Sequence, residues 1–339
     1  MDTSRPIAQF YDLEGWEEPF LQEQLPGFAV RGTTEHLGAE TAARGADAEV
    51  VSVFIHSRLN AETLARLPAL RMVAARSTGF DHIDLVTTGT RGIAVANVPT
   101  YGENTVAEHA FALILALARN LHRAHIRTSA GNFSLEGLRG FDLLGKRLGI
   151  VGAGSIGLHL ARMAKGFGME VVVSDIRQNR LLADVLGFRY VDLNELLATS
   201  DVISLHLPYS PAVHHLIDRE RLATVKRGAL LINTARGGLV DTEALLWALD
   251  QGIIGGAGLD VFEGEDVIDN EEALLARPDA EHALRQAMRV YLLGRRENVV
   301  LTPHSGFNSH EAVQRILDTT VENINAYQKG KLQNIVSAS

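Results

Sequence analysis

Short β-branched runs alternate with helical patterns along almost the whole chain, and this alternation constrains the fold more than any other feature. It is typical of parallel βαβ units, because each parallel strand needs a crossover helix to bring the chain back to the same end of the sheet. The predicted strands are Ile7–Tyr11, Phe28–Arg31, Val50–Ile55, Met72–Ala75, Ile93–Asn97, Arg147–Val151, Glu170–Ser174, Val202–His206, Ala229–Asn233, Gly256–Asp260 and Val299–Thr302. We therefore predict an α/β protein with doubly wound parallel sheets.

Helical patterns fill the longer intervals between these strands. One predicted helix covers about Asn104–Thr128, and a final one covers Ser309–Gln328, while Gly131–Gly145 has the composition of a loop. The apolar run Ala110–Ala118 is far shorter than the roughly 20 residues of a membrane span, so we expect it in a core or a subunit interface. Asp266–Glu297 lacks a strand pattern, and we expect one or two helices there.

The length of 339 residues favours two domains. Pro99 and Pro303 each follow an apolar strand, and together they bracket the second group of strands. If these prolines mark hinges, a domain of residues 101–302 is inserted into a discontinuous domain of residues 1–100 plus 303–339. The alternative is two consecutive domains divided near residue 145, and composition alone does not decide between them.

Composition excludes several classes of function. The chain has no cysteine, so it has no disulfide framework, thiolate nucleophile or cysteine-based zinc site, and we assign no metal ligand. A formal net charge of -9 argues against binding to nucleic acid or to an acidic membrane, because phosphate groups would be repelled over most of the surface. The first residues are acidic and lack the apolar core of a signal peptide, so we expect a cytoplasmic protein.

A glycine-rich turn indicates a dinucleotide site. The segment Val151-Gly-Ala-Gly-Ser-Ile-Gly157 follows a predicted strand and opens a helical pattern, which is the context that a G-x-G-x-x-G motif requires. Gly152 permits the tight turn, Gly154 lets the backbone approach a pyrophosphate, and Gly157 allows the helix to pack closely on the strand. The N–H groups of Ser155 and Ile156 would then face the phosphates.

The residues at the next strand ends refine this prediction. Asp175 ends the strand that follows the motif, where a carboxylate accepts hydrogen bonds from ribose hydroxyls and repels a 2′-phosphate. We therefore predict NAD (NADH) rather than NADP, although Arg177 could weaken the discrimination. His206, Leu207 and Pro208 follow another strand and are predicted to form a wall of the cofactor crevice. A histidine at a strand end is otherwise a structural hydrogen-bonding group.

Arg236, Glu265 and His304 each follow a predicted strand, so a doubly wound sheet would bring them to one crevice at its carboxyl edge. Hydride transfer to a 2-oxo acid builds negative charge on the carbonyl oxygen, which needs a proton donor and a cation nearby. His304 can donate the proton, and Glu265 can favour its protonated form. Arg236 can grip a carboxylate in a fork. Each residue alone could be structural, but together beside a nucleotide site they favour catalysis.

Long ordered motifs then show a family resemblance. They are TGFDHIDL, NVPTYGENTVAEHA, VGAGSIG, DVISLHLP, INTARGGLVD, GLDVFEGE and TPHSGF. In these motifs the chain resembles the D-isomer-specific 2-hydroxyacid dehydrogenases over nearly its whole length. The resemblance implies a Rossmann NAD-binding domain inserted into a discontinuous flavodoxin-like substrate domain. It also implies that Arg236, Glu265 and His304 are catalytic, and that the enzyme is a homodimer joined through its nucleotide domain.

The same resemblance implies further contacts. Those with the substrate are the backbone amides of Thr78 and Gly79, and the pocket side chains of Tyr101 and Phe307. Those with the nicotinamide side of the cofactor are Thr234, Ala235 and Asp260.

Within the family, the long gap between Glu265 and His304 resembles the D-lactate dehydrogenase branch, because the glycerate and phosphoglycerate branches close this gap sooner with a proline-rich stretch. The expected reaction is therefore reduction of pyruvate to D-lactate by NADH. The enzymatic alternative is a reductase of glyoxylate, hydroxypyruvate or a bulkier 2-oxo acid. An alternative of another class is an NAD-sensing binding protein, as in corepressors that resemble the family.

Two positions depart from the family pattern. Val213 stands where many members have a polar residue near the cofactor. His56 stands where lactate enzymes often have an aromatic residue at the substrate pocket, so the side chain of the substrate is left open by the sequence.

Overall fold

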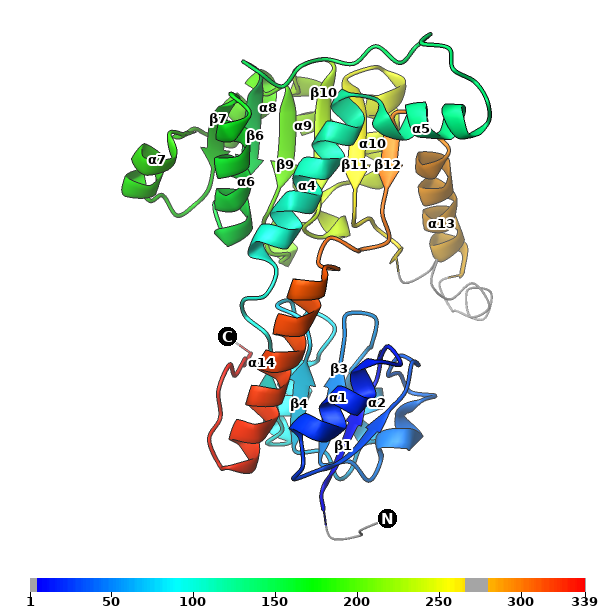
Figure 1. Ribbon diagram of the computed structural model, residues 1–339, viewed down its shortest axis with the longest axis vertical. Coiled ribbons are helices and arrows are strands. Elements are labelled where there is room, and N and C mark those ends of the chain that lie inside the picture. The colour runs from blue at the N-terminus through cyan, green and yellow to red at the C-terminus, as the bar shows by residue number, and fades with distance from the viewer. Residues whose placement is uncertain (1–4, 266–279, 339) are drawn as a thin grey trace. The chain divides into compact units, whose positions relative to one another are not determined.

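The computed structural model describes residues 5–265 and 280–338, which fall into two units with a sheet each (Figure 1). Unit 1 contains Met1–Tyr101 and Ser309–Ser339, and unit 2 contains Gly102–Asn308. The chain is therefore not divided near residue 145. The first break falls after residue 101, where we predicted 100, but the second falls after residue 308 rather than after 302.

Unit 1 contains a parallel sheet of five strands in the order β2-β1-β3-β4-β5. This is the order of flavodoxin-like sheets, in which the winding reverses beside the first strand. The strands are β1 (Ile7–Phe10), β2 (Ala29–Gly32), β3 (Val50–Val53), β4 (Met72–Ala75) and β5 (Ala94–Ala96).

Both faces of this sheet are covered, because successive strand residues point to opposite sides. Met72 and Ala74 pack in one core, and Val73 and Ala75 pack in the other. The first core is closed by α1 (Glu17–Gln24) and α14 (His310–Gln328), and the second by α2 (Ala61–Ala65) and α3 (Leu85–Thr90). The 3₁₀ turn η1 (Ala42–Gly45) precedes β3.

Unit 2 contains a parallel sheet of seven strands in the order β12-β11-β10-β9-β6-β7-β8. Its central part has the Rossmann order, with the switch point between β6 and β9. The strands are β6 (Arg147–Val151), β7 (Glu170–Ser174), β8 (Arg189–Tyr190), β9 (Val202–Leu205), β10 (Ala229–Asn233), β11 (Ile254–Leu259) and β12 (Val299–Leu301). The prediction of doubly wound parallel sheets is confirmed, although β8, only two residues long, was not predicted.

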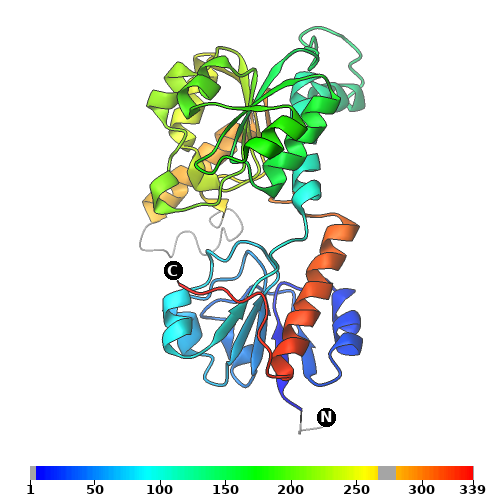
Figure 2. The same ribbon diagram turned by 90° about the vertical axis from the view of Figure 1, so that its left-hand side faces the viewer.

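Helices cover both faces of this sheet as well (Figures 1 and 2). On one face lie α4 (Glu103–Ala118) and α6 (Ser155–Gly166). On the other lie α8 (Leu193–Thr199), α9 (Arg219–Thr224) and α10 (Thr242–Asp250). The remaining elements are α5 (Leu121–Ser129), α7 (Arg180–Leu186), η2 (Pro211–Val213), η3 (Gly237–Leu239) and α13 (Ala280–Gly294). Helix α13 lies in the predicted helical interval 266–297, of which residues 266–279 are outside the described residues.

The single helix predicted over Asn104–Thr128 is wrong, because the chain breaks between α4 and α5. Asn120 has a left-handed backbone (φ 51°), and its side-chain amide donates to the carbonyl oxygens of Leu138 and Arg139. The returning loop crosses the end of α4 so closely that a Cβ at Gly140 would lie 2.1 Å from Ala118 O. Contacts with this loop therefore end the helix, and asparagine tolerates the conformation required.

The apolar stretch of α4 belongs to the core of unit 2. Ala110, Phe111, Leu113, Ile114 and Leu117 are all buried against the sheet and α6. Within residues 5–265 and 280–338, no helix has the length and apolar character that crossing a membrane requires.

Candidate active site

The glycine-rich turn joins β6 to α6 at the switch point of the sheet. Gly152 has φ +103°, and a Cβ there would lie 2.7 Å from His206 O in the turn after β9. A Cβ at Gly157 would lie 2.2 Å from Gly152 O, so both positions exclude a side chain. Gly154 is exposed and has no atom within 4 Å of a Cβ placed on it, so its backbone is open to a ligand.

Ser155 and Ile156 form the first turn of α6, where backbone N–H groups have no partner within the helix. Gly154 precedes them as the N-cap and supplies no side-chain acceptor. The positive end of this twelve-residue helix therefore suits the phosphates of a dinucleotide.

Asp175 follows β7 and holds the glycine-rich turn. Its carboxylate accepts hydrogen bonds from the N–H groups of Ala153 at 2.6 Å and Arg177 at 2.7 Å. Each oxygen has a second lone pair, and the residue is partly exposed, so it can also accept from ribose hydroxyls.

His206 follows β9 and is held in place by contacts within the protein. Its N–H donates to Val151 O at 2.8 Å, and its Nε2 lies 2.8 Å from Ser204 Oγ. Desolvation by the surrounding protein lowers the pKa of His206 to about 4, so the ring is neutral at neutral pH. The next residue, Leu207, lies beside Gly152, and Pro208 is exposed.

Thr234 and Ala235 follow β10. Ala235 N–H donates to Asn233 Oδ1 at 3.1 Å. The Thr234 side chain is buried, and its Oγ1 has no hydrogen-bond partner among the residues that the structure describes. A buried hydroxyl in this state is satisfied once a ligand binds beside it. This hydroxyl and the open backbone at Gly154 both fit a dinucleotide.

The three residues predicted to be catalytic follow the neighbouring strands β10, β11 and β12. His304 Nδ1 lies 2.9 Å from Glu265 Oε2, and both side chains are about one quarter exposed (23% and 27%). Glu265 Oε1 accepts from Phe262 N at 2.6 Å, which orients the carboxylate. With Nδ1 directed at Glu265, Nε2 of His304 is the nitrogen that can face a substrate.

Arg236 lies on a loop that packs directly on the turn carrying Glu265. Asn233 Nδ2 donates to Arg236 O at 2.9 Å, and Arg236 Nη1 donates to Ala235 O at 2.7 Å. A Cβ at Gly237 would lie 2.2 Å from the carbonyl carbon of Phe262. The structure therefore brings the Arg236 loop, the Glu265 turn and His304 together.

Asp260 positions the loop that bears His304. This buried carboxylate accepts from Thr302 Oγ1 at 2.5 Å, Ser305 N at 2.9 Å and Gly306 N at 2.8 Å. The loop stays with the sheet of unit 2 for this reason, which explains why the second break falls later than predicted. His304 itself has a left-handed backbone (φ 49°), and its N–H donates to Asp260 O at 3.0 Å.

Asp260 has a partner on α4 that was not predicted from the sequence. His109 Nε2 lies 3.3 Å from Asp260 Oδ1 and 3.0 Å from Thr302 Oγ1. Burial works against ionisation of Asp260, but hydrogen bonds from His109, Thr302 and Gly306 outweigh it and lower its pKa. The carboxylate predicted to contact the nicotinamide thus already has four donors within the protein. The motif NVPTYGENTVAEHA contains His109, but nothing local in it indicates this contact.

Three of the predicted substrate contacts lie in unit 1. Thr78 and Gly79 follow β4; Thr78 Oγ1 donates to Val98 O at 2.8 Å, and Gly79 O accepts from Ser77 Oγ at 2.6 Å. Tyr101 O accepts from Arg315 Nε at 2.6 Å. Phe307 is partly buried and lies in unit 2, in the loop that carries His304.

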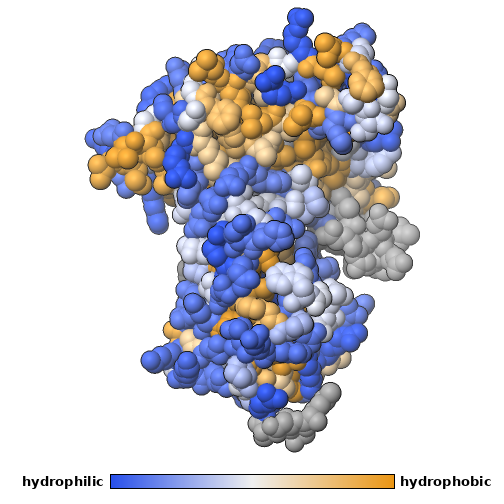
Figure 3. Space-filling model, viewed as in Figure 1, coloured by the Kyte–Doolittle hydropathy of each residue, from blue (hydrophilic) through white to orange (hydrophobic). Residues whose placement is uncertain are grey.

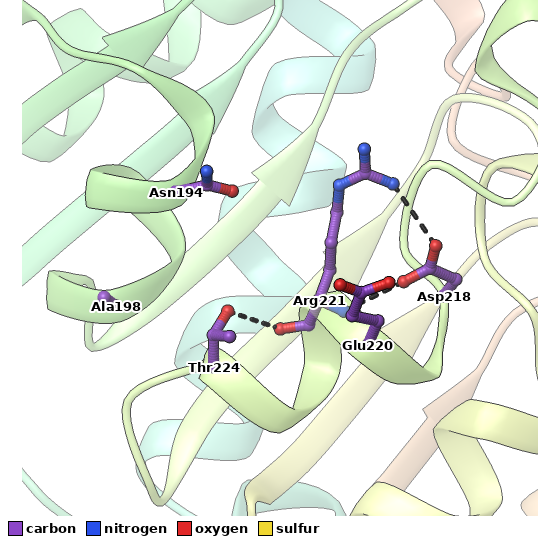
Figure 4. A pocket seen from close by; sticks show the side chains of 6 residues that line it. All are labelled: Asn194, Ala198, Asp218, Glu220, Arg221 and Thr224. Atoms are coloured by element: carbon purple, nitrogen blue, oxygen red, sulfur yellow. Dashed lines mark hydrogen bonds and ion pairs between the residues drawn. The ribbon is translucent and has the colours of Figure 1, made fainter.

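A separate depression of about 480 Å³ lies between α8 and α9 (Figure 4). Its lining residues are Asn194, Ala198, Asp218, Glu220, Arg221 and Thr224. Arg221 Nη1 pairs with Asp218 at 3.3 Å, so the charge of this guanidinium is compensated within the depression. None of the predicted site residues lines it, and we assign it no role.

Comparison with known proteins agrees with this geometry. The model of the family "D-isomer specific 2-hydroxyacid dehydrogenase, NAD binding domain" matches residues 111–306. The D-lactate dehydrogenase of Escherichia coli is 34% identical over 95% of this chain and 96% of its own. A glyoxylate reductase of Korarchaeum cryptofilum is 37% identical over 84% of this chain and 81% of its own.

Solved structures give the same answer. The D-lactate dehydrogenase of Aquifex aeolicus, complexed with NAD and lactic acid, superposes with a TM-score of 0.88 at 35% identity, and the match covers 98% of this chain and 99% of that one. The family model spans more than half of the chain, and the relatives match nearly all of it. The chain therefore belongs to the D-isomer-specific 2-hydroxyacid dehydrogenases and is an NAD-dependent oxidoreductase.

Proposed function

We propose that this enzyme is a D-lactate dehydrogenase that reduces pyruvate to D-lactate with NADH. The observation that carries the proposal is the pair of His304 and Glu265 at 2.9 Å, next to the loop of Arg236. The likeness to D-lactate dehydrogenases over nearly the whole chain supports pyruvate as the substrate.

Residues of unit 2 would hold the cofactor, which supplies the hydride when bound. Gly152, Gly154 and Gly157 leave room for its pyrophosphate, and the N–H groups of Ser155 and Ile156 bind the phosphates. Asp175 accepts hydrogen bonds from the ribose hydroxyls. A wall of the cofactor crevice is assigned to His206, Leu207 and Pro208. Contacts with the nicotinamide side of the cofactor are assigned to Thr234, Ala235 and Asp260.

The protein residues then handle charge and the proton. Arg236 grips the substrate carboxylate and the carbonyl oxygen, which fixes orientation as well as charge. His304 Nε2 donates a proton to the carbonyl oxygen as negative charge develops there. Glu265 favours the protonated imidazole and holds its ring in place. The amides of Thr78 and Gly79 for the carboxylate, and Tyr101 and Phe307 for the pocket, remain predictions.

A substrate panel tests the proposal. We would measure kcat/KM for pyruvate, glyoxylate, hydroxypyruvate and phenylpyruvate, each with NADH and with NADPH. Pyruvate with NADH should give the highest value. A higher value for another 2-oxo acid would reject lactate as the product while leaving the reaction class in place.

Reduction of glyoxylate or hydroxypyruvate is the second candidate function. The loop after β3 carries His56, whose ring lies 5.2 Å from that of His36 and 6.5 Å from that of Phe54. A polar imidazole suits the hydroxymethyl group of hydroxypyruvate better than a phenyl ring does. The similarity to a glyoxylate reductase points the same way, and the panel separates the two candidates.

We also propose that the enzyme is a homodimer. Leu121 and Ile126 on α5 are about two thirds exposed, at 63% and 66%. Phe133, Leu135 and Leu144 on the loop that follows are even more exposed. Figure 3 shows hydrophobic residues gathered over unit 2 on the face that it presents. Exposed apolar groups of this number on one unit favour a second copy of the chain as their cover.

The amino-acid composition supports our proposal for the binding partners of the enzyme and for its location in the cell. The net charge of -9 disfavours nucleic acid and acidic membranes as partners, so the small 2-oxo acid is the expected ligand besides NAD. The absence of cysteine suits a cytoplasmic enzyme.

A further inference from the structure

Three side chains able to bind a metal ion lie together in unit 2. His214 and His215 follow η2, and Glu263 lies in the turn after β11. One ligand atom from each residue lies within 4.8 Å of the other two. The proposed dehydrogenase mechanism uses none of these side chains.

Glu263 and His215 form the better ordered half of the cluster. His215 Nε2 lies 2.7 Å from Glu263 Oε1, and the two side chains are 34% and 13% exposed. Thr242 donates both its N–H, at 3.0 Å, and its hydroxyl, at 2.7 Å, to the other carboxylate oxygen. The carboxylate is thus held by surrounding groups with one oxygen directed at His215, as metal-binding carboxylates are.

His214 supplies a second imidazole from the solvent side. Its ring stacks on that of His215 with 3.8 Å between centroids, and Tyr209 Oη lies 3.2 Å from its Nδ1. The backbone of His215 is left-handed (φ 50°), and its N–H donates to Gly238 O at 2.8 Å, so the two rings are carried on a turn that is fixed to the Arg236 loop. His214 is exposed, which gives an ion a path to the cluster.

We propose that His214, His215 and Glu263 bind one divalent transition-metal ion of the zinc class, with water completing the coordination. Two imidazole nitrogens and one carboxylate oxygen are ligands that zinc takes in proteins, at about 2.0–2.2 Å. The ion would replace the proton shared by His215 and Glu263. The exposed His214 ring has to move inward, and His215 Nε2 and Glu263 Oε1 have to separate by about half an ångström from their 2.7 Å contact, to bring all three ligands to bonding distance.

The site connects to the residues of the reaction through the backbone. Glu263 lies in the same turn as Glu265, and Phe262 in that turn packs against Gly237. An ion would therefore cross-link the turn after η2 to the segment that carries Glu265. Because it binds the folded chain, it should also raise the melting temperature.

Titration of the tag-free, cofactor-free chain with Co²⁺ tests the proposal, because a site of this kind gives a visible absorption band that binding through surface charges does not. We expect saturation at one ion per chain and displacement by Zn²⁺. His214→Asn and Glu263→Gln should each weaken Co²⁺ binding at least about tenfold. His125→Asn, which removes an exposed imidazole from α5, should bind as the parent does.

Circular dichroism establishes that the variants are folded. If Glu263→Gln does not fold because its contacts with Thr242 are lost, the exposed His214→Asn decides alone. Two results would overturn the proposal: no Co²⁺ spectrum up to about 1 mM, far weaker than an engaged three-ligand site, or an unchanged spectrum and affinity in His214→Asn.

Discussion

Single carboxylates hold the loops that carry the candidate catalytic residues. Asp175 accepts the N–H of Ala153 in the glycine-rich turn and the N–H of Arg177 in its own loop. Asp260 accepts two N–H groups in the His304 loop, and Glu265 accepts one while it contacts His304. Removing such a side chain would disturb the loop as well as the charge. Substitution by the corresponding amide keeps an acceptor and therefore separates the two effects.

Glu265→Gln should lower the pH above which reduction fails, because the variant no longer supplies a negative charge that favours protonated His304. We expect the alkaline limb of the kcat/KM profile for 2-oxo acid reduction to move to lower pH. Glu281→Gln, which alters an exposed carboxylate on α13, is the control and should leave the profile unchanged. An alkaline limb that stays in place in Glu265→Gln would contradict the coupling.

Asp260→Asn should destabilise unit 2 by about 2–4 kcal/mol at neutral pH, because it removes a buried charged acceptor and leaves a donor unpaired. The pKa of Asp260 is lowered in the folded protein, so its contribution is present above the ordinary value of about 3.9 and is lost as pH falls through the folded pKa. The difference in unfolding free energy between parent and variant should shrink as pH falls below about 4, where the Asp260 carboxylate becomes protonated. Urea unfolding between about pH 3 and 7 measures it, and a difference that stays constant down to about pH 3 would reject the assignment.

Asp175→Asn should narrow the preference for NADH over NADPH, because the repulsion of a 2′-phosphate is removed while an acceptor for Ala153 N–H remains. Loss of about 1–2 kcal/mol of discrimination corresponds to a fall of about 5- to 30-fold in the ratio of the two kcat/KM values. Retention of the full preference would mean that another residue selects the cofactor.

At the scale of elements, the site depends on direct backbone contact between two loops, the loop of η3 and the turn after β11. The loop of η3 approaches the turn after β11 so closely that only a glycine fits at position 237. This contact fixes the Arg236 loop against the turn that carries Glu265, and so positions the proposed substrate clamp relative to His304, the proposed proton donor.

Gly237→Ala should reduce kcat by about 10- to 100-fold, because displacement of a catalytic group by about 1 Å has effects of this size. Gly89→Ala is the matched control: it lies in α3, no atom is within 4 Å of its Cβ position, and alanine favours a helix by about 1 kcal/mol. The control should keep its activity and melt at the same or a higher temperature. Equal activities of the two variants would show that the close contact does not position Arg236.

At the scale of the whole molecule, the exposed apolar residues of α5 and the loop after it should determine the oligomeric state. Ile126→Asp places a charge among them and should convert a dimer to a monomer. Light scattering after size-exclusion chromatography at micromolar concentration measures this. Val86→Asp changes an equally exposed residue (67%) on α3 of unit 1 and should stay dimeric. A parent chain that elutes as a monomer would reject the dimer itself.

Much of this fold could be predicted from the sequence. Strands β4, β6, β7 and β10 begin and end where predicted, because strands buried on both faces appear as continuous apolar runs. The glycine-rich turn and the residues that follow β10, β11 and β12 were predicted from their positions at strand ends, since parallel strands bring those ends to one edge.

Contacts between segments that are far apart in the sequence determine the features that could not be predicted. The break at Asn120 depends on the returning loop near Gly140, and the place of the His304 loop in unit 2 depends on Asp260. The cluster of His214, His215 and Glu263 likewise joins two segments that share no local pattern. Periodicity records how each segment is buried, so the sequence by itself determined the elements and the strand ends that carry the chemistry. It does not record which side chain meets which across the fold, because those hydrogen bonds and close approaches form only when the segments pack together, and the tertiary structure alone decided them.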